Sequence, residues 1–210
     1  MSAAARELAA ADPAMAALVE RLGEIDLETR LRRRSEERPA DAYGALLRAI
    51  VGQQLSTKAA RTIYRRVCEI FGGTTPSPEQ LLAADEEDLR GAGLSGRKVS
   101  YVRDLASHVL SGELELDRLG ELSDEQVVEE IVAVRGLGQW TAEMFLLFHL
   151  ERPDVLSGGD LGIRKAVQAE YGLEEMPPPQ KVLEIGEAWR PHRSLASLYL
   201  WESLASVPVE

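Results

Sequence analysis

Apolar residues recur every three or four positions along most of the chain, which is the spacing of helices that bury one face. The spacing is clearest between residues 41 and 71, where apolar side chains follow it over two stretches. A break at residues 52–56 separates those stretches, and Ser56 is a good N-cap for the second. Strict alternation of apolar and polar residues is almost absent, so we expect an all-α protein.

Other helix starts are marked by their capping residues. Asp12 and Pro13 combine an N-cap with a first-turn proline, and Ser77 opens a short helix. Ser123 and Gln126 have the spacing of a capping box before a helix over residues 124–134. Further helices are predicted over residues 1–23, over 99–110, from 139 onward, over 161–169 and after the prolines at 177–179.

Length and cysteine content limit the class of protein. A chain of 210 residues with 45% hydrophobic content can bury a core in one large domain or two small lobes. The single cysteine, Cys68, excludes an internal disulfide and a four-cysteine iron–sulfur cluster, and its place in a helix predicts burial. No secretion signal or long apolar span is visible, so we expect a cytoplasmic protein.

Charge is the main argument against a nucleic-acid partner. The formal net charge is −11, and binding to a phosphate backbone depends on neutralising phosphates. Net charge conceals distribution, however, because arginines gather in residues 30–38 and again at Arg61, Arg65 and Arg66, while residues 113–130 are strongly acidic. Two interpretations stay open: a basic face opposite an acidic one, or a solvated connector in residues 30–38.

The motif richest in chemistry is a turn at Gly136, Leu137 and Gly138 between two predicted helices. Glycines allow a tight turn, and the amides at the start of the following helix form a natural anion site. Asp160 follows downstream, directly after Gly158 and Gly159. Taken alone, the turn is more typical of a packed helix–helix bend than of an anion site, and Asp160 is more typical of an N-cap than of a catalytic residue.

Four ordered blocks change that balance: residues 49–56, residues 93–98, the hairpin with residues 159–165, and residues 189–194. Together they resemble the helix-hairpin-helix (HhH-GPD) DNA glycosylase superfamily, in its 3-methyladenine DNA glycosylase II branch. The resemblance covers residues 40–202. It implies a two-lobed helical enzyme with its cleft between the lobes, which flips alkylated purines such as 3-methyladenine and 7-methylguanine out of DNA and hydrolyses the N-glycosidic bond.

The resemblance also assigns roles to residues of the site. It places Asp160 at the catalytic aspartate position, where a carboxylate stabilises positive charge on the sugar. Strand-cleaving relatives carry a Schiff-base lysine where this chain has Trp140, so we predict a monofunctional glycosylase without lyase activity. The predicted substrate pocket consists of Trp140, Trp201, Met144, Leu161 and Gln54.

The predicted DNA contacts come from the hairpin, a wedge loop and the helix after Asp160. By resemblance the tip of the wedge loop falls at Gly96, and glycine cannot fill the gap left by a flipped base. The full predicted set is Gly136, Gly138, Thr141, Arg135, Leu94, Ser95, Gly96, Arg97, Lys98, Arg164 and Lys165. No cofactor is required by this interpretation, although family members often hold a monovalent cation (Na⁺ or K⁺) through hairpin carbonyls, here those of Val132, Val134 and Leu137.

These predictions together define one domain organisation and one partner, and two alternative functions stay open. Residues 1–40 are expected to pack on the second lobe, residues 41–150 to form the lobe with the wedge loop and hairpin, and residues 151–210 to complete the second lobe. The expected partner is double-stranded DNA with damaged bases. We expect the protein to bind it as a monomer, and we expect no membrane partner. The alternatives are a glycosylase for deaminated or oxidised bases and a non-catalytic DNA-binding module.

Overall fold

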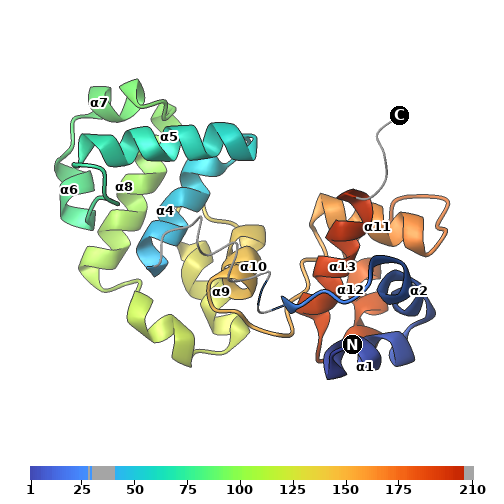
Figure 1. Ribbon diagram of the computed structural model, residues 1–210. Helices are drawn as coiled ribbons and strands as arrows, with labels where there is room; N and C mark the ends of the chain where they lie inside the picture. The colour runs from blue at the N-terminus through green and yellow to red at the C-terminus, as the bar shows by residue number, and fades with distance from the viewer. Residues whose placement is uncertain (28, 30–40, 206–210) are drawn as a thin grey trace. The chain divides into compact units, whose positions relative to one another are not determined.

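The computed structural model describes residues 1–27, 29 and 41–205, whose regular structure is entirely helical (Figure 1). This confirms the all-α prediction. The arginine cluster predicted in residues 30–38 lies outside the described residues. In the part that is described, no helix is both long and apolar enough to cross a membrane.

The chain divides into two compact units. Among the described residues, the first unit comprises residues 1–27, 29 and 146–205, and the second comprises residues 41–145. The N-terminal and C-terminal segments therefore belong to one unit, and the middle of the chain forms the other.

The second unit is built around two central helices, α4 and α8. Helix α8 packs against α6, α7 and α4, and α4 also packs against α5 and the 3-10 turn η1 (Figure 1). The bounds are α4 Ala42–Gly52, α5 Thr57–Ile70, α6 Pro78–Ala83, α7 Glu86–Gly91, α8 Gly96–Ser111, η1 Leu116–Glu121, α9 Asp124–Ala133 and α10 Gln139–Phe148. The last three residues of α10 are counted with the first unit.

The first unit joins both ends of the chain in one core. Helix α13 packs against α2 and α11, and α1 packs against α2. The bounds are α1 Ala3–Ala11, α2 Pro13–Leu22, α11 Leu161–Glu170, α12 Pro179–Gly186, η2 Glu187–Trp189 and α13 Arg193–Ala205.

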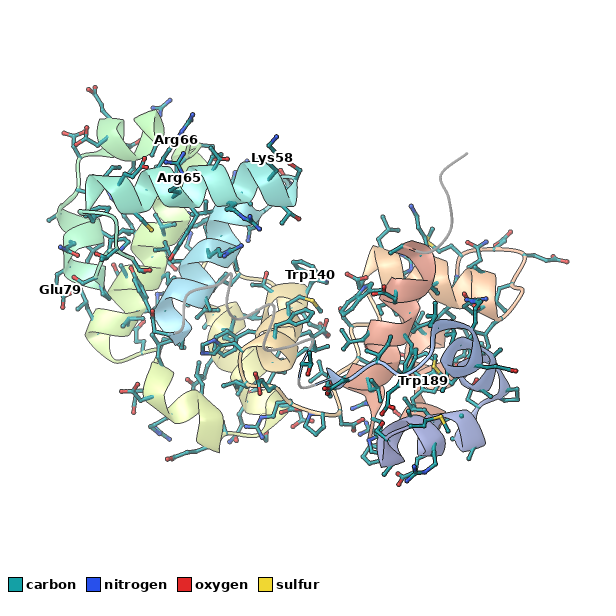
Figure 2. All side chains as sticks on the ribbon, in the orientation of Figure 1. Lys58, Arg65, Arg66, Glu79, Trp140 and Trp189 are labelled. Carbon is teal, nitrogen blue, oxygen red and sulfur yellow. The ribbon has the colours of Figure 1, made fainter. Side chains whose placement is uncertain are left out.

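A polar network ties distant parts of this first core together. Asp12 caps α2 through Oδ1, and its Oδ2 accepts a hydrogen bond of 2.7 Å from the Tyr171 hydroxyl. The buried Trp189, labelled in Figure 2, donates its Nε1–H to the same Tyr171 oxygen at 3.2 Å. Because a buried polar group needs a partner, these bonds satisfy three side chains brought from far apart in the sequence.

The predicted caps are present where the sequence placed them. Asp12, Ser56 and Ser77 each accept a hydrogen bond from a first-turn amide, and Ser123 and Gln126 form both bonds of a capping box. Helix α7 was not predicted, because its six residues are too few to show a periodic pattern.

Candidate active site

The Asp160 carboxylate is held in place by two hydrogen-bond donors. Its Oδ1 accepts a bond of 2.9 Å from the Ile163 amide, which makes Asp160 the N-cap of α11. The same oxygen accepts a second bond of 2.9 Å from the indole Nε1–H of Trp201 on α13. These donors on Oδ1 help to fix the orientation of the partly exposed carboxylate, which is what a group that stabilises charge on a substrate requires.

The indole of Trp201 is positioned by its own neighbours. Its ring stacks on Phe148, with 5.8 Å between the ring centroids and 25° between the planes. Gly162 lies beneath the contact, because a Cβ there would come within 3.0 Å of both Asp160 Oδ1 and Trp201 Cδ1. The absence of a side chain at residue 162 therefore allows α13 to bring the indole up to the carboxylate.

The loop that precedes Asp160 is fastened to the start of α13. Arg193 donates from Nε to Asp154 Oδ1 at 2.8 Å and from Nη2 to the Asp154 carbonyl at 2.7 Å. Ser194 Oγ donates to the Arg152 carbonyl at 2.6 Å and accepts from the Val155 amide at 3.0 Å. Helix α13 therefore holds both the loop, through its first turn, and the carboxylate, through Trp201.

The hairpin lies between α9 and α10 in the second unit. Gly136 has a φ of +87°, in the left-handed region that favours glycine, whereas Gly138 does not. The main-chain amides of Gly136 and Gly138 have no acceptor among the described residues. They adjoin the N-terminus of α10, where the helix dipole favours an anion.

Three side chains from other parts of the second unit hold the hairpin. Gln53 Nε2 donates to the Gly136 carbonyl at 2.5 Å, and Asp104 Oδ2 accepts from the Arg135 amide at 2.8 Å. The ring of Tyr101 lies against Gly136, so that a Cβ there would be 2.2 Å from a ring carbon. The hairpin is thus fixed to α8 and to the turn after α4.

Comparison with known proteins decides the family. The model of the HhH-GPD superfamily of base excision DNA repair proteins matches residues 47–191. The chain belongs to this superfamily. It is 36% identical to DNA-3-methyladenine glycosylase 1 of Schizosaccharomyces pombe over 165 residues, which are 78% of this chain and 72% of that protein. It is also 32% identical over 168 residues, 77% of this chain, to the putative DNA-3-methyladenine glycosylase YfjP of Bacillus subtilis, but spans only 58% of that protein.

Solved structures of the superfamily share the fold over nearly the whole chain. The 3-methyladenine DNA glycosylase of S. pombe, solved in complex with abasic DNA, has a TM-score of 0.82 and 30% identity, with 100% of both chains covered. The DNA-3-methyladenine glycosidase of Bacillus halodurans has a TM-score of 0.84 and 38% identity, with 98% of this chain and 90% of that chain covered.

The residues predicted for the substrate pocket come from both units. Trp201 and Leu161 lie in the first unit beside Asp160, and Leu161 is 53% exposed. Trp140, labelled on α10 in Figure 2, is 49% exposed although it is a large apolar side chain. Gln54 is exposed as well, on the turn after α4, and Met144 is partly exposed. An exposed Trp140 is not the core residue that an apolar helix face alone would suggest.

The DNA contact predicted for Leu94 in the wedge loop is contradicted by its burial. This side chain is only 3% exposed and packs in the core of the second unit, so it cannot insert into a duplex. Ser95 is the N-cap of α8, and Gly96 and Arg97 are exposed at the start of that helix.

Lys98 and Thr141 have roles other than the predicted phosphate contacts. Lys98 Nζ donates to the carbonyls of Val51 at 2.7 Å and Gln53 at 2.8 Å, and so caps the C-terminal end of α4 from α8. The Thr141 amide donates to the Gly138 carbonyl at 2.9 Å inside the first turn of α10. Both groups have protein acceptors, because tertiary packing and helix formation bring carbonyls to them.

The remaining predicted DNA contacts differ in their exposure. Arg135, Gly138 and Lys165 are exposed. Arg164 is partly buried and donates from Nε to the Pro177 carbonyl at 2.8 Å, so one edge of its guanidinium holds the loop before α12.

Several residues that build the site were missed by the sequence analysis. They are Tyr101 and Asp104 around the hairpin, and Asp154, Arg193 and Ser194 around the Asp160 loop. Arg193 and Ser194 lie in one of the four blocks that carry the resemblance, and that was the available signal. Cys68 is buried as predicted, and burial raises the pKa of its thiol, which keeps it in the unreactive form.

Replacing Trp201 with phenylalanine is expected to slow base release about tenfold, since it removes the indole donor to Asp160 Oδ1 and retains a stacked ring. A hydrogen bond to a charged group contributes about 1.5–3 kcal/mol, of which part is lost to solvent screening here. Single-turnover base release and binding of abasic DNA would be measured together.

The control for that variant is Phe148→Leu, which removes the stacking partner and keeps the indole N–H. If Phe148→Leu slowed base release as much as Trp201→Phe, stacking would account for the effect and the hydrogen bond would not.

Proposed function

We propose that this protein is a monofunctional DNA glycosylase of base excision repair, which removes alkylated purines of the 3-methyladenine and 7-methylguanine type and leaves an abasic site. The observation that carries the proposal is the Asp160 carboxylate, fixed by the Ile163 amide and the Trp201 indole at 2.9 Å each. Relatives with 36% and 32% identity have the name DNA-3-methyladenine glycosylase, the second as a putative one, which supports the same chemistry.

The role of Asp160 follows from the charge that develops during the reaction. Departure of a purine builds positive charge on the deoxyribose, and an oriented carboxylate beside the sugar stabilises that charge and directs a water molecule. Purines alkylated on a ring nitrogen already carry positive charge and leave without protonation. The reaction therefore requires one carboxylate and no separate general acid.

Selection of the base is assigned to the exposed Trp140, together with the partly exposed Trp201. The electron-rich face of an indole attracts a cationic ring by stacking and cation–π interaction, which contribute about 0.5–2 kcal/mol per contact. Trp140 is 49% exposed and is available for such a contact. Met144 and Leu161 make the remaining predicted pocket less aromatic, so it offers fewer ring faces for such contacts.

Duplex DNA is the proposed partner, bound by a single chain. The amides of Gly136 and Gly138, which have no acceptor in the described part of the chain, are suited to one backbone phosphate, with Arg135 exposed beside them. A 30% identical glycosylase of S. pombe has been solved with abasic DNA, which supports this partner. The place of action in this proposal is the cytoplasm, at the nucleoid.

Because Leu94 is buried, we assign the role of filling the gap left by a flipped base to side chains in the turn after α4. Gln54 has a φ of +58°, which is rare for a residue other than glycine and is often found at functional sites. Both Gln54 and the 38% exposed Leu55 follow Gln53, whose side chain contacts the hairpin. An exposed side chain close to the phosphate grip is positioned to enter a duplex held there.

The absence of lyase activity rests on the residue at the start of α10. A Schiff base needs a primary amine, and residue 140 is tryptophan. Borohydride should therefore trap no covalent complex with abasic DNA, and trapping through Lys165 would contradict this part of the proposal.

The deciding experiment measures free bases released from DNA treated with a methylating agent. Release of 3-methyladenine and 7-methylguanine supports the proposal. Preferred release of hypoxanthine, ethenoadenine or 8-oxoguanine from defined duplexes would instead support the alternative of deaminated or oxidised substrates. Tight binding to an abasic analogue without release of any base would identify a non-catalytic module.

A monovalent cation in the hairpin is a further part of the proposal. Val132 and Val134 lie at the C-terminal end of α9, where helix carbonyls lack intrahelical partners, and Leu137 is in the turn. The Val134 carbonyl accepts from the Leu137 amide at 3.1 Å and retains a second lone pair. These carbonyls suit Na⁺ or K⁺, and a bound cation would add positive charge beside the phosphate.

Replacing Na⁺ and K⁺ by choline at equal ionic strength is therefore expected to lower the melting temperature by a few degrees and to weaken DNA binding, since the hairpin carbonyls lose their partner. Thermal unfolding without DNA separates the two effects. Identical unfolding curves in choline, Na⁺ and K⁺ would rule out the site.

A further inference from the structure

Helix α5 is basic, although the protein as a whole is acidic. The chain has 24 lysines and arginines against 35 aspartates and glutamates. Within α5, however, there are four basic residues and one acid, Glu69. All four basic side chains are exposed, and we name them the α5 stripe: Lys58, Arg61, Arg65 and Arg66.

The stripe follows the outer side of the helix. Residues 58, 61 and 65 are separated by three and four positions, so they lie on one face, with Arg66 beside it. Val67 and Cys68 are buried, and α5 packs on α4. At a rise of about 1.5 Å per residue, Lys58 and Arg65 are roughly 10 Å apart along the axis. Figure 2 shows Lys58 toward one end of α5 and Arg65 and Arg66 farther along it.

The stripe is joined to the hairpin within the second unit. Ser56, the N-cap of α5, follows the turn at residues 53–55. Gln53 in that turn donates to the Gly136 carbonyl, and Lys98 donates to the Gln53 carbonyl. The α5 stripe therefore begins a few residues from the contact that anchors the proposed phosphate grip.

We propose that the α5 stripe binds backbone phosphates of the duplex next to the damaged site, as a second DNA contact beyond the hairpin. The inference rests on the proposed function for its ligand. An acidic protein repels DNA, and a row of exposed cations on one helix offsets that repulsion where it is needed. Arg65 pairs with Glu69, but both side chains are largely exposed, at 64% and 53%, so a phosphate can replace this weakly held partner.

The test is the salt dependence of DNA binding by a triple variant, Lys58→Gln, Arg65→Gln and Arg66→Gln. Each phosphate contact contributes about 0.9 to the slope of log affinity against log salt. We expect the slope to fall by about 2–3 units and the affinity at low salt to fall at least tenfold, on undamaged and on abasic-analogue duplexes. The rate of base release at saturating protein should stay that of the wild type.

The matched control removes the same charge elsewhere. Arg21, Arg118 and Lys181 are similarly exposed, at 52%, 56% and 53%, and their replacement by Gln changes the net charge equally. A variant with Lys58→Arg, Arg65→Lys and Arg66→Lys should keep the wild-type slope, and melting temperatures show whether each variant is folded.

Equal changes of slope in the stripe and control variants would overturn the proposal, because only net charge would then matter. If the stripe variant lost binding to single-stranded RNA but still bound duplex DNA, the proposed duplex contact would be overturned and RNA would be the ligand of the α5 stripe. The proposed function can fail separately: a wild-type protein that releases no base but shows the stripe-specific slope would retain this DNA contact and lose the enzymatic assignment.

Discussion

Replacing Asp160 with asparagine is expected to slow base release about 10²–10³-fold, the usual effect of removing an electrostatic group that acts on the transition state. Asparagine is as good an N-cap as aspartate, and its side-chain oxygen can accept from the Ile163 amide and the Trp201 indole. The substitution therefore removes the charge and retains the local structure. Single-turnover release of 3-methyladenine, at saturating protein, is the measurement.

Comparison with Asp160→Ala separates the two roles of this residue. Alanine removes the cap as well as the charge, and loss of an N-cap destabilises a protein by about 0.5–2 kcal/mol. Both variants should release bases at least about 10²-fold more slowly than the wild type, but only Asp160→Ala should have a clearly lowered melting temperature. Near wild-type base release by Asp160→Asn would show that Asp160 only caps α11, and the catalytic proposal would fail.

Replacing Gly136 with alanine is expected to lower the free energy of unfolding by about 2–4 kcal/mol, which is roughly 5–15 °C in melting temperature. A Cβ at this residue would lie 2.2 Å from the Tyr101 ring, and the backbone φ of +87° disfavours any side chain. Because either the ring or the turn must move, binding of abasic DNA should weaken as well.

Gly138→Ala is the matched control for the hairpin. A Cβ at Gly138 meets nothing within 4 Å, and its φ is outside the left-handed region, so the loss should stay below about 1 kcal/mol. A Tyr101→Ala, Gly136→Ala double variant should be less destabilised than the sum of the single variants, since the clash is removed. Equal destabilisation by Gly136→Ala and Gly138→Ala would contradict this account of the turn.

Much of the local structure could be predicted from the sequence because its causes lie within four residues. The capping box of Ser123 and Gln126 and the N-cap of Asp12 depend only on side chains next to the amides they satisfy. Asp160 shows the limit of such reasoning. Its cap to Ile163 is local, but the donor that fixes its orientation comes from Trp201, which is 41 residues away.

The wrong predictions share one physical origin. Leu94 and Lys98 were assigned to a DNA-contacting loop, but Leu94 is buried and Lys98 donates to carbonyls at the end of α4. A loop sequence does not reveal which side chain faces the core, because burial depends on the helices that pack against it. The same reason hid Tyr101, whose ring is in contact with a glycine 35 positions later.

The sequence by itself determined the helical class, the positions of the main caps, the glycine turn before α10 and the aspartate after the second glycine pair. All of these arise from backbone preferences and short-range hydrogen bonds, which residue identity and spacing specify. Only the tertiary structure decided which side chains hold the hairpin and the carboxylate, and which loop residues reach the surface. Contacts between residues 30 or more positions apart form only when the helices pack, and sequence spacing carries no measure of that distance.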